Sequence, residues 1–244
     1  MCTPDLAVIT ASLEGLEETI ILKLIDRAQF LINSSVYAPG QSGMEESEGE
    51  SLFDLRLRYT EEMDALFGRY CVPEERPFNV DLPDPRRKVT LPPTCLNIND
   101  FNKVSLTAEI RKRYIELVPR ICGLGDDGQY GSSVEHDIHA LQAISRRIHY
   151  GALYVAEAKY QSAPQHYRNL IERRDTEALT ALLTRKEVEE QILERISHKV
   201  AYLQAEADRA VRKIIDPEEV LTFYRDHVIP LTKKGEVLYL LHRS

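Results

Sequence analysis

Four charged side chains lie in or beside strongly apolar helical repeats: Arg147, Lys159, Glu189 and Glu236. A helical bundle that turned such residues inward would gather cations and carboxylic acids in one cavity, an arrangement that suits the binding of an anion. The alternative is that each side chain lies on the solvated face of its helix, as most charged residues do. Spacing alone does not decide between the two, because the helical period says which residues share a face and not what that face contacts.

The composition indicates a soluble, globular protein with a sizeable core. The chain has 244 residues, of which 43% are hydrophobic, and a formal net charge of -8. An acidic chain disfavours a nucleic-acid partner, because affinity for phosphate backbones comes from clustered lysine and arginine. An anionic ligand would therefore need a local basic pocket.

Neither a membrane nor a metal is expected as a partner. The amino terminus carries Asp5 and Glu14 and no apolar run long enough for a signal peptide or a membrane span, which predicts a cytoplasmic protein. The cysteines lie far apart, without a CxxC pair or a histidine at metal-ligand spacing. We interpret them as reduced thiols that hold no metal: Cys2, Cys71, Cys95 and Cys122.

Apolar residues at every third or fourth position predict long helices in the first half of the chain. The first covers about residues 5–33 and the second about residues 52–70. Between them, residues 39–51 are polar, acidic and rich in glycine, which indicates a flexible surface loop. Closely spaced prolines then exclude regular structure over residues 72–101, which we interpret as an extended connection wrapped onto the core.

The second half of the chain is also expected to be helical. Glu135 and Asp137 are assigned to the first turn of a helix that Ser132 or Ser133 caps. No stretch keeps the alternation of a strand, so we expect an all-α, single-domain, multi-helix bundle over residues 1–244, without a significant sheet. Further helices are predicted over residues 102–121 and 165–172, from Asp175, from Lys186, and after Asp216-Pro217, with Pro230 kinking or dividing the last one.

Several segments together resemble the all-helical chorismate mutases of fungi and plants, and the resemblance covers nearly the whole chain. It implies an isomerase that catalyses the Claisen rearrangement of chorismate to prephenate in aromatic amino-acid biosynthesis, without a cofactor, and that forms a homodimer. The segments are Gly125-Asp-Asp-Gly-Gln-Tyr-Gly-Ser-Ser133, Leu141-Gln-Ala-Ile-Ser-Arg-Arg-Ile-His149, Val155-Ala-Glu-Ala-Lys159, Val228-Ile-Pro-Leu-Thr-Lys-Lys-Gly-Glu236 and Tyr239-Leu-Leu-His-Arg243.

The resemblance also implies roles for residues in these motifs. Arg147 would bind a substrate carboxylate, Lys159 would reach the ether oxygen and a carboxylate, and Glu189 would meet the ring hydroxyl. Thr232 and Glu236 would complete the pocket. Glu236 can donate a hydrogen bond to the ether oxygen only while it keeps its proton, so we expect burial and the dianionic ligand to raise its pKa.

A first departure from the family lies in the first predicted helix. The family has an arginine there, before the Glu17-Glu-Thr-Ile-Ile21 run, that holds the second carboxylate, but the aligned residue is Thr10. Thr10 and Ile229 are still expected to line the pocket, and Arg185 aligns with its rim. Three alternatives stay open: a basic group such as Arg185 compensates, the substrate is an amino or isomeric analogue of chorismate, or the protein binds a ligand or protein partner without catalysis.

A second departure lies between Gly151 and Lys159. The stretch Gly151-Ala-Leu-Tyr-Val155 contains one residue more than the family has before Val-Ala-Glu-Ala-Lys. One extra residue turns a regular helix by about 100°, which would point Lys159 away from Arg147. Wide single turns absorb such insertions and occur at functional sites, so we predict one over residues 151–154.

A third departure concerns regulation. The family often binds tryptophan or tyrosine as an effector at the dimer interface, near an arginine pair and the Gly-Ser start of a helix. The chain keeps Arg69, Gly131 and Ser132 but has Gly68 where the arginine pair would begin. An effector site and the simpler interpretation, a helix cap and a surface arginine, both stay open.

Overall fold

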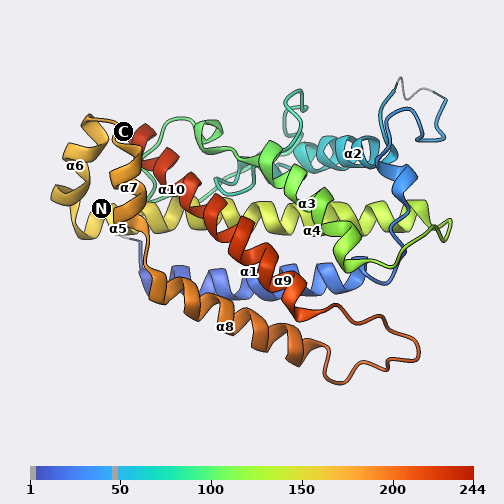
Figure 1. Ribbon diagram of the computed structural model, residues 1–244. Helices are drawn as coiled ribbons and strands as arrows, with labels where there is room; N and C mark the ends of the chain where they lie inside the picture. Colours follow the sequence, from blue (N-terminus) through green and yellow to red (C-terminus); the bar gives the residue numbers. More distant parts are fainter. Residues whose placement is uncertain (1–3, 46–48) are drawn as a thin grey trace.

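The computed structural model describes residues 4–45 and 49–244 and shows a bundle of helices (Figure 1). Within these residues, β-type pairing is limited to the isolated bridges Leu31–Gly123 and Ile98–Arg243, so the predicted all-α fold without a significant sheet is confirmed. Short 3-10 helices are η1 (Ser34–Tyr37), η2 (Arg69–Cys71) and η3 (Phe101–Val104), and the π-helical turns are η4 (Gly151–Val155) and η5 (Tyr224–Val228). The α-helices are α1 (Leu6–Arg27), α2 (Leu52–Leu66), α3 (Thr107–Ile121), α4 (Tyr130–Tyr150), α5 (Ala156–Ser162), α6 (Pro164–Glu172), α7 (Thr176–Leu183), α8 (Lys186–Leu203), α9 (Pro217–Phe223) and α10 (Ile229–His242).

Helices α1 and α4 lie side by side in opposite directions and form the centre of the bundle (Figure 1). Helices α2, α3 and α10 pack against α4, and α8 packs against α1. Each large apolar side chain buried between them contributes about 1.5 to 3 kcal/mol relative to an exposed one. The main core includes Ile20, Leu24, Ile138, Leu141 and Ile144, and a second cluster around Leu153, Leu179 and Leu240 joins η4, α7 and α10.

The first helix is shorter than predicted, because it ends at Arg27 rather than near residue 33. The Arg27 side chain is fully buried and donates hydrogen bonds to the carbonyl oxygens of Leu31 and Ile32, both at 3.1 Å. Its Nε lies 2.5 Å from the carboxylate of Asp137 on α4. The guanidinium therefore satisfies the backbone just beyond α1 and joins this segment to the next helix in the core.

The start of α4 also differs from the prediction. The helix begins at Tyr130, so neither Ser132 nor Ser133 is its N-cap, and the Ser133 hydroxyl instead donates to the Tyr130 carbonyl at 3.0 Å. The first turn of α4 contains no acidic residue, so the placement of Glu135 and Asp137 there was wrong as well. Asp137 has no exposed surface and is the core partner of an arginine, not a partner of the helix dipole.

The connection between η2 and η3 contains no helix, as predicted for residues 72–101 except at Phe101, where η3 begins. A fully buried carboxylate holds it to the bundle: Glu61 of α2 accepts hydrogen bonds from the backbone N–H groups of Phe78 and Asn79, both at 2.8 Å. Helix α2 ends four residues earlier than predicted, and Gly68 follows it with φ 85°, a left-handed conformation that favours glycine. Of the loop predicted over residues 39–51, residues 46–48 lie outside the described residues.

The cysteines differ in state. Cys71 is an exposed free thiol and Cys122 a buried one. Cys95 is disulfide-bonded, so the prediction of a reduced thiol is wrong there, and Cys2 lies outside the described residues. Spacing along the chain does not reveal which cysteines approach one another in space. No helix in the described ranges has the length and apolar character needed to span a membrane.

Candidate active site

All eight residues predicted to contact a substrate line a single cavity of about 320 Å³. They belong to five helices, α1, α4, α5, α8 and α10, except for Arg185, which directly precedes α8. Residues as far apart in the chain as 10 and 236 thus face the same space. The eight are Thr10, Arg147, Lys159, Arg185, Glu189, Ile229, Thr232 and Glu236.

The wide turn predicted near Gly151 is confirmed, because residues Gly151–Val155 form the π-helical turn η4 between α4 and α5. The backbone stays helical on both sides, so the two helices continue one another. The turn absorbs the additional residue and leaves Lys159 on the side of the cavity. There its Nζ lies 2.8 Å from Glu236 Oε2 and 3.1 Å from the carbonyl oxygen of Leu183.

Two glycines let α10 approach this turn closely. A Cβ atom at Gly151 would lie 2.8 Å from Cγ2 of Thr232, and one at Gly235 would lie 2.5 Å from Cβ of Ala152. Real Cβ atoms essentially never approach other atoms so closely. The absence of side chains at these two positions therefore brings Thr232 and Glu236 of α10 within reach of the cations on α4 and α5.

Arg147 is a buried cation with hydrogen-bonding capacity to spare. Its side chain is 3% exposed, and its Nη1 donates to Thr232 Oγ1 at 3.0 Å. Nη2 lies 3.7 Å from Glu17, and Nε has no hydrogen-bond partner among the described residues. Buried polar groups normally have partners, and a carboxylate in the cavity would supply them by accepting from the planar guanidinium.

Glu17, Arg195 and Lys233 also line the cavity, although none of them was predicted from the sequence. The fully buried Glu17 carboxylate accepts two hydrogen bonds from Arg195, both at 2.9 Å. Lys233 lies 2.8 Å from the predicted site residue Glu189. A signal for Glu17 does exist, because it falls on the same helical face as Ile20 and Leu24 and so had to be buried with them.

Burial dominates the electrostatics of Glu236. Its loss of hydration raises the pKa of the carboxyl group above its usual value, although the neighbouring Lys159 ammonium acts in the opposite direction. A raised pKa favours the protonated acid, which can donate a hydrogen bond to a ligand oxygen. The site thus places an ammonium and a potential carboxylic-acid donor side by side.

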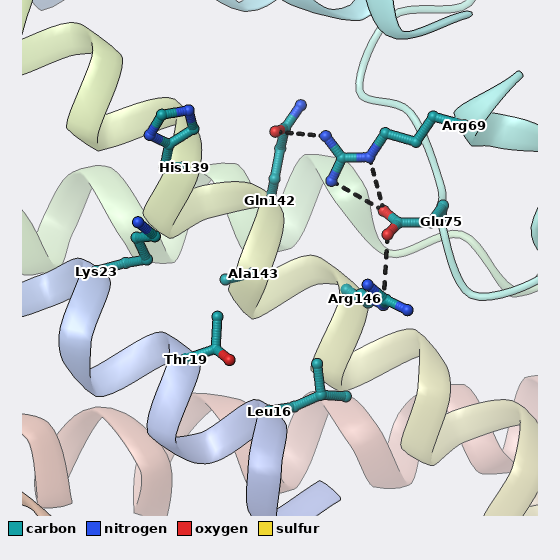
Figure 2. A pocket seen from close by; sticks show the side chains of 9 residues that line it. All are labelled: Leu16, Thr19, Lys23, Arg69, Glu75, His139, Gln142, Ala143 and Arg146. Atoms are coloured by element: carbon teal, nitrogen blue, oxygen red, sulfur yellow. Dashed lines mark hydrogen bonds and ion pairs between the residues drawn. The ribbon is translucent and has the colours of Figure 1, made fainter. Parts of the chain in front are cut away.

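The residues predicted for an effector are not gathered in one place. Figure 2 shows a second hollow, of about 380 Å³, where Arg69 bonds Gln142 at 2.7 Å and Glu75 at 3.1 Å. Gly131 and Ser132 do not line this hollow. Ser132 precedes Gln142 by about 15 Å along α4, at 1.5 Å per residue. Within one chain, therefore, Arg69 lies apart from the Gly-Ser pair.

The sequence is similar to known enzymes over nearly its full length. A chorismate mutase of Schizosaccharomyces pombe is 40% identical over 239 residues, which cover 93% of this chain and 91% of the relative. The chain belongs to the chorismate mutase family. The predictions of this family and of an isomerase are confirmed, and no protein-family model matches the chain.

Solved chorismate mutases share the fold. The enzyme from Candida albicans, in complex with L-Trp, has a TM-score of 0.90 and 36% identity, covering 98% of this chain and 91% of that one. AtCM1 with phenylalanine bound in its allosteric site has a TM-score of 0.84 and 36% identity, covering 96% of this chain and 94% of that one. AtCM1 was also solved with tyrosine in the allosteric site, with a TM-score of 0.83.

Proposed function

We propose that the cavity binds chorismate and converts it to prephenate, a step of phenylalanine and tyrosine biosynthesis. The observation that carries the proposal is the convergence of Arg147, Lys159 and Glu236 on one cavity from three different helices. Chorismate has two carboxylates and an ether oxygen. The cations in the cavity suit the carboxylates, and a hydrogen-bond donor suits the ether oxygen.

The reaction is a unimolecular rearrangement in which the ether C–O bond breaks while a new C–C bond forms. Atoms are neither gained nor lost, so the protein needs no nucleophile. It can accelerate the step by holding the folded, chair-like conformer and by stabilising the charge that grows on the ether oxygen. Both tasks are electrostatic and geometric, which suits a cavity with fixed, buried ionic groups.

Arg147 is the proposed anchor for one substrate carboxylate, held in place by Thr232 and by the buried Glu17. Lys159 and a protonated Glu236 are proposed to donate hydrogen bonds to the ether oxygen. Their Nζ and Oε2 atoms are 2.8 Å apart, so one acceptor atom can lie within reach of both.

Glu189 is the proposed partner of the ring hydroxyl. Its carboxylate can accept a hydrogen bond from that hydroxyl while it stays ion-paired with Lys233. Thr10 and Ile229 are proposed to contact the substrate through the uncharged part of the lining. These contacts would fix the position of the ring while the enolpyruvyl group folds over it.

The proposal is tested by following chorismate loss and prephenate formation with purified protein. Replacing Arg147 with alanine removes a charged contact worth about 1.5 to 3 kcal/mol for each hydrogen bond. Two lost bonds predict a fall in kcat/KM of at least about 100-fold. Arg113→Ala, at a half-buried arginine of α3 that is ion-paired with Glu116 and does not line the cavity, is the matched control. Wild-type protein without prephenate formation would contradict the function, and Arg147→Ala with most of its activity would remove Arg147 from the site.

We also propose that the protein is a cytoplasmic homodimer that an aromatic amino acid regulates. Apolar side chains remain exposed along one face of α2, at Tyr59 and Met63, and at its C-cap Phe67, as expected for a surface that a second copy covers. Arg69 and the Gly131-Ser132 pair, separated within one chain, could then meet across the interface around tryptophan or tyrosine. Sedimentation that shows only a monomer at all concentrations would contradict the dimer.

A further inference from the structure

The lining of the cavity carries more cations than carboxylates. Its positive side chains are Arg147, Lys159, Arg185, Arg195 and Lys233, and its negative ones are Glu17, Glu189 and Glu236. With all of them ionised, the lining has a formal surplus of two positive charges. That surplus equals the charge of a dicarboxylate, so the question is which two cations are free to bind it.

Three of the five cations already lie in direct ion pairs. Arg195 lies 2.9 Å from Glu17, Lys233 lies 2.8 Å from Glu189, and Lys159 lies 2.8 Å from Glu236. Taking Arg195 away from Glu17 would leave a fully buried carboxylate without its closest partner, which is costly. With all groups ionised, these pairs do not provide the surplus charge. When Glu236 is protonated, the additional positive charge is on Lys159, which the proposed function assigns to the ether oxygen.

The surplus resides on the other two arginines. Arg147 is buried, and its nearest carboxylate, Glu17, lies 3.7 Å away, farther than in the other three pairs. Arg185 lines the cavity from its exposed edge, and its side chain forms no hydrogen bond or ion pair with any residue in the described part of the chain. An exposed guanidinium without a partner can turn toward a ligand without breaking an existing contact.

The two arginines are connected to different members of the Lys159–Glu236 pair. Arg147 donates to Thr232, which lies one helical turn before Glu236 on α10. Lys159 donates both to Glu236 and to the carbonyl oxygen of Leu183, two residues before Arg185. These contacts connect Arg147 to the helix that carries Glu236, and they connect Lys159 to the segment that carries Arg185.

The wall that α1 contributes cannot supply the second anchor. Its lining residues are Leu6, Thr10, Leu13 and Glu17, none of which is a cation. We propose that Arg185 binds the second carboxylate of the substrate, so that Arg147 and Arg185 hold the dianion at its two ends with the ether oxygen between them. This inference rests on the proposed function, because it takes chorismate as the ligand.

The experiment compares the binding of three ligands to the wild type and to Arg185→Ala. The ligands are a bicyclic dicarboxylate ether that mimics the rearranging substrate, and its two monomethyl esters. We expect Arg185→Ala to weaken binding of the dicarboxylate by about 10- to 100-fold, the loss typical of a charge-assisted contact. It should weaken one monoester to a similar degree and leave the other unchanged, because that ester already lacks the carboxylate that Arg185 binds.

Two further variants separate binding from a general effect of charge. Lys186→Ala removes the same charge one residue away, outside the cavity lining, and should bind all three ligands like the wild type. Arg185→Lys should retain part of the affinity for the dicarboxylate. Equal weakening of all three ligands in Arg185→Ala would mean that Arg185 acts through the structure or the overall field, and it would overturn the assignment.

The outcomes also distinguish this inference from the proposed function. If the wild type turns over chorismate and Arg185→Ala has the same KM and kcat within twofold, the second anchor is not Arg185, although the function stands. If the wild type neither turns over chorismate nor binds the dicarboxylate, the proposed function fails first. The thermal midpoint of each variant shows whether it is folded.

Discussion

Replacing Gly235 with alanine should damage catalysis more than it damages folding. The new Cβ would lie 2.5 Å from Cβ of Ala152, and ordinary contact begins at 3.4 Å, so α10 and the η4 turn must separate by about 0.9 Å. Ala152 cannot yield by a rotamer change, because its Cβ is fixed to the backbone. Overpacking lowers the free energy of unfolding by about 1 to 3 kcal/mol, and the higher helix propensity of alanine relative to glycine raises it by about 1 kcal/mol. The net loss of stability is therefore at most about 2 kcal/mol.

The effect on turnover should be larger, because Gly235 immediately precedes Glu236 and the displaced segment also carries Thr232. A misplacement of about 1 Å at a catalytic group can cost about 100-fold in rate, so kcat/KM for chorismate should fall by about that factor. Urea unfolding and steady-state kinetics on the same preparation measure both effects. The control is Gly15→Ala on α1, where a Cβ meets nothing within 4 Å: it should leave kcat/KM unchanged and stabilise the protein slightly. If Gly235→Ala keeps kcat/KM within twofold of the wild type, the close approach of α10 to η4 does not position the site.

Two predictions concern pH. Burial raises the pKa of Glu236, and only the protonated acid donates a hydrogen bond, so activity should decline as pH rises through that pKa. The Glu236→Gln side chain cannot ionise and should flatten the decline in kcat against pH. Coincident pH profiles of the wild type and this variant would refute the donor role. Burial lowers the pKa of His149 to about 4. Between pH 6.5 and 4 the unfolded state therefore takes up a proton that the folded state does not. The free energy of unfolding should fall by up to about 3 kcal/mol as the pH falls through that window. Urea unfolding of His149→Gln should show a correspondingly weaker pH dependence, and an equal dependence would contradict the reasoning.

The sequence allowed most of the fold to be predicted, because apolar spacing marks a helix wherever one face is buried. The helices capped by Asp175 and Asp216 begin where those side chains indicate. Two of the errors arose where a polar residue has its partner far away in the chain. Arg27 and Asp137 are 110 residues apart and neutralise each other in the core, which local periodicity cannot show. That pairing explains both the early end of α1 and the misassigned first turn of α4.

The residues of the candidate site could not be predicted from apolar spacing, which had indicated the helices. Arg147, Lys159 and Glu236 were chosen by resemblance to a family, since their spacing alone was equally consistent with a solvated face. The insertion before Lys159 was the informative local feature, because its length requires a wide turn if the lysine is to stay in the cavity. Glu17 and Arg195 were missed, because their pairing depends on how α8 lies against α1 and no sequence pattern specifies that.

The wide turn at Gly151–Val155 makes the backbone geometry of this segment matter more than most of its side chains. If the same five residues formed a regular α-helix, everything beyond them would be rotated by about 100°. The ammonium of Lys159 would then leave Glu236. A related chain with one residue fewer needs no wide turn and can place its lysine at the same point with a regular helix, so an alignment that opens a one-residue gap here is the one that pairs equivalent lysines.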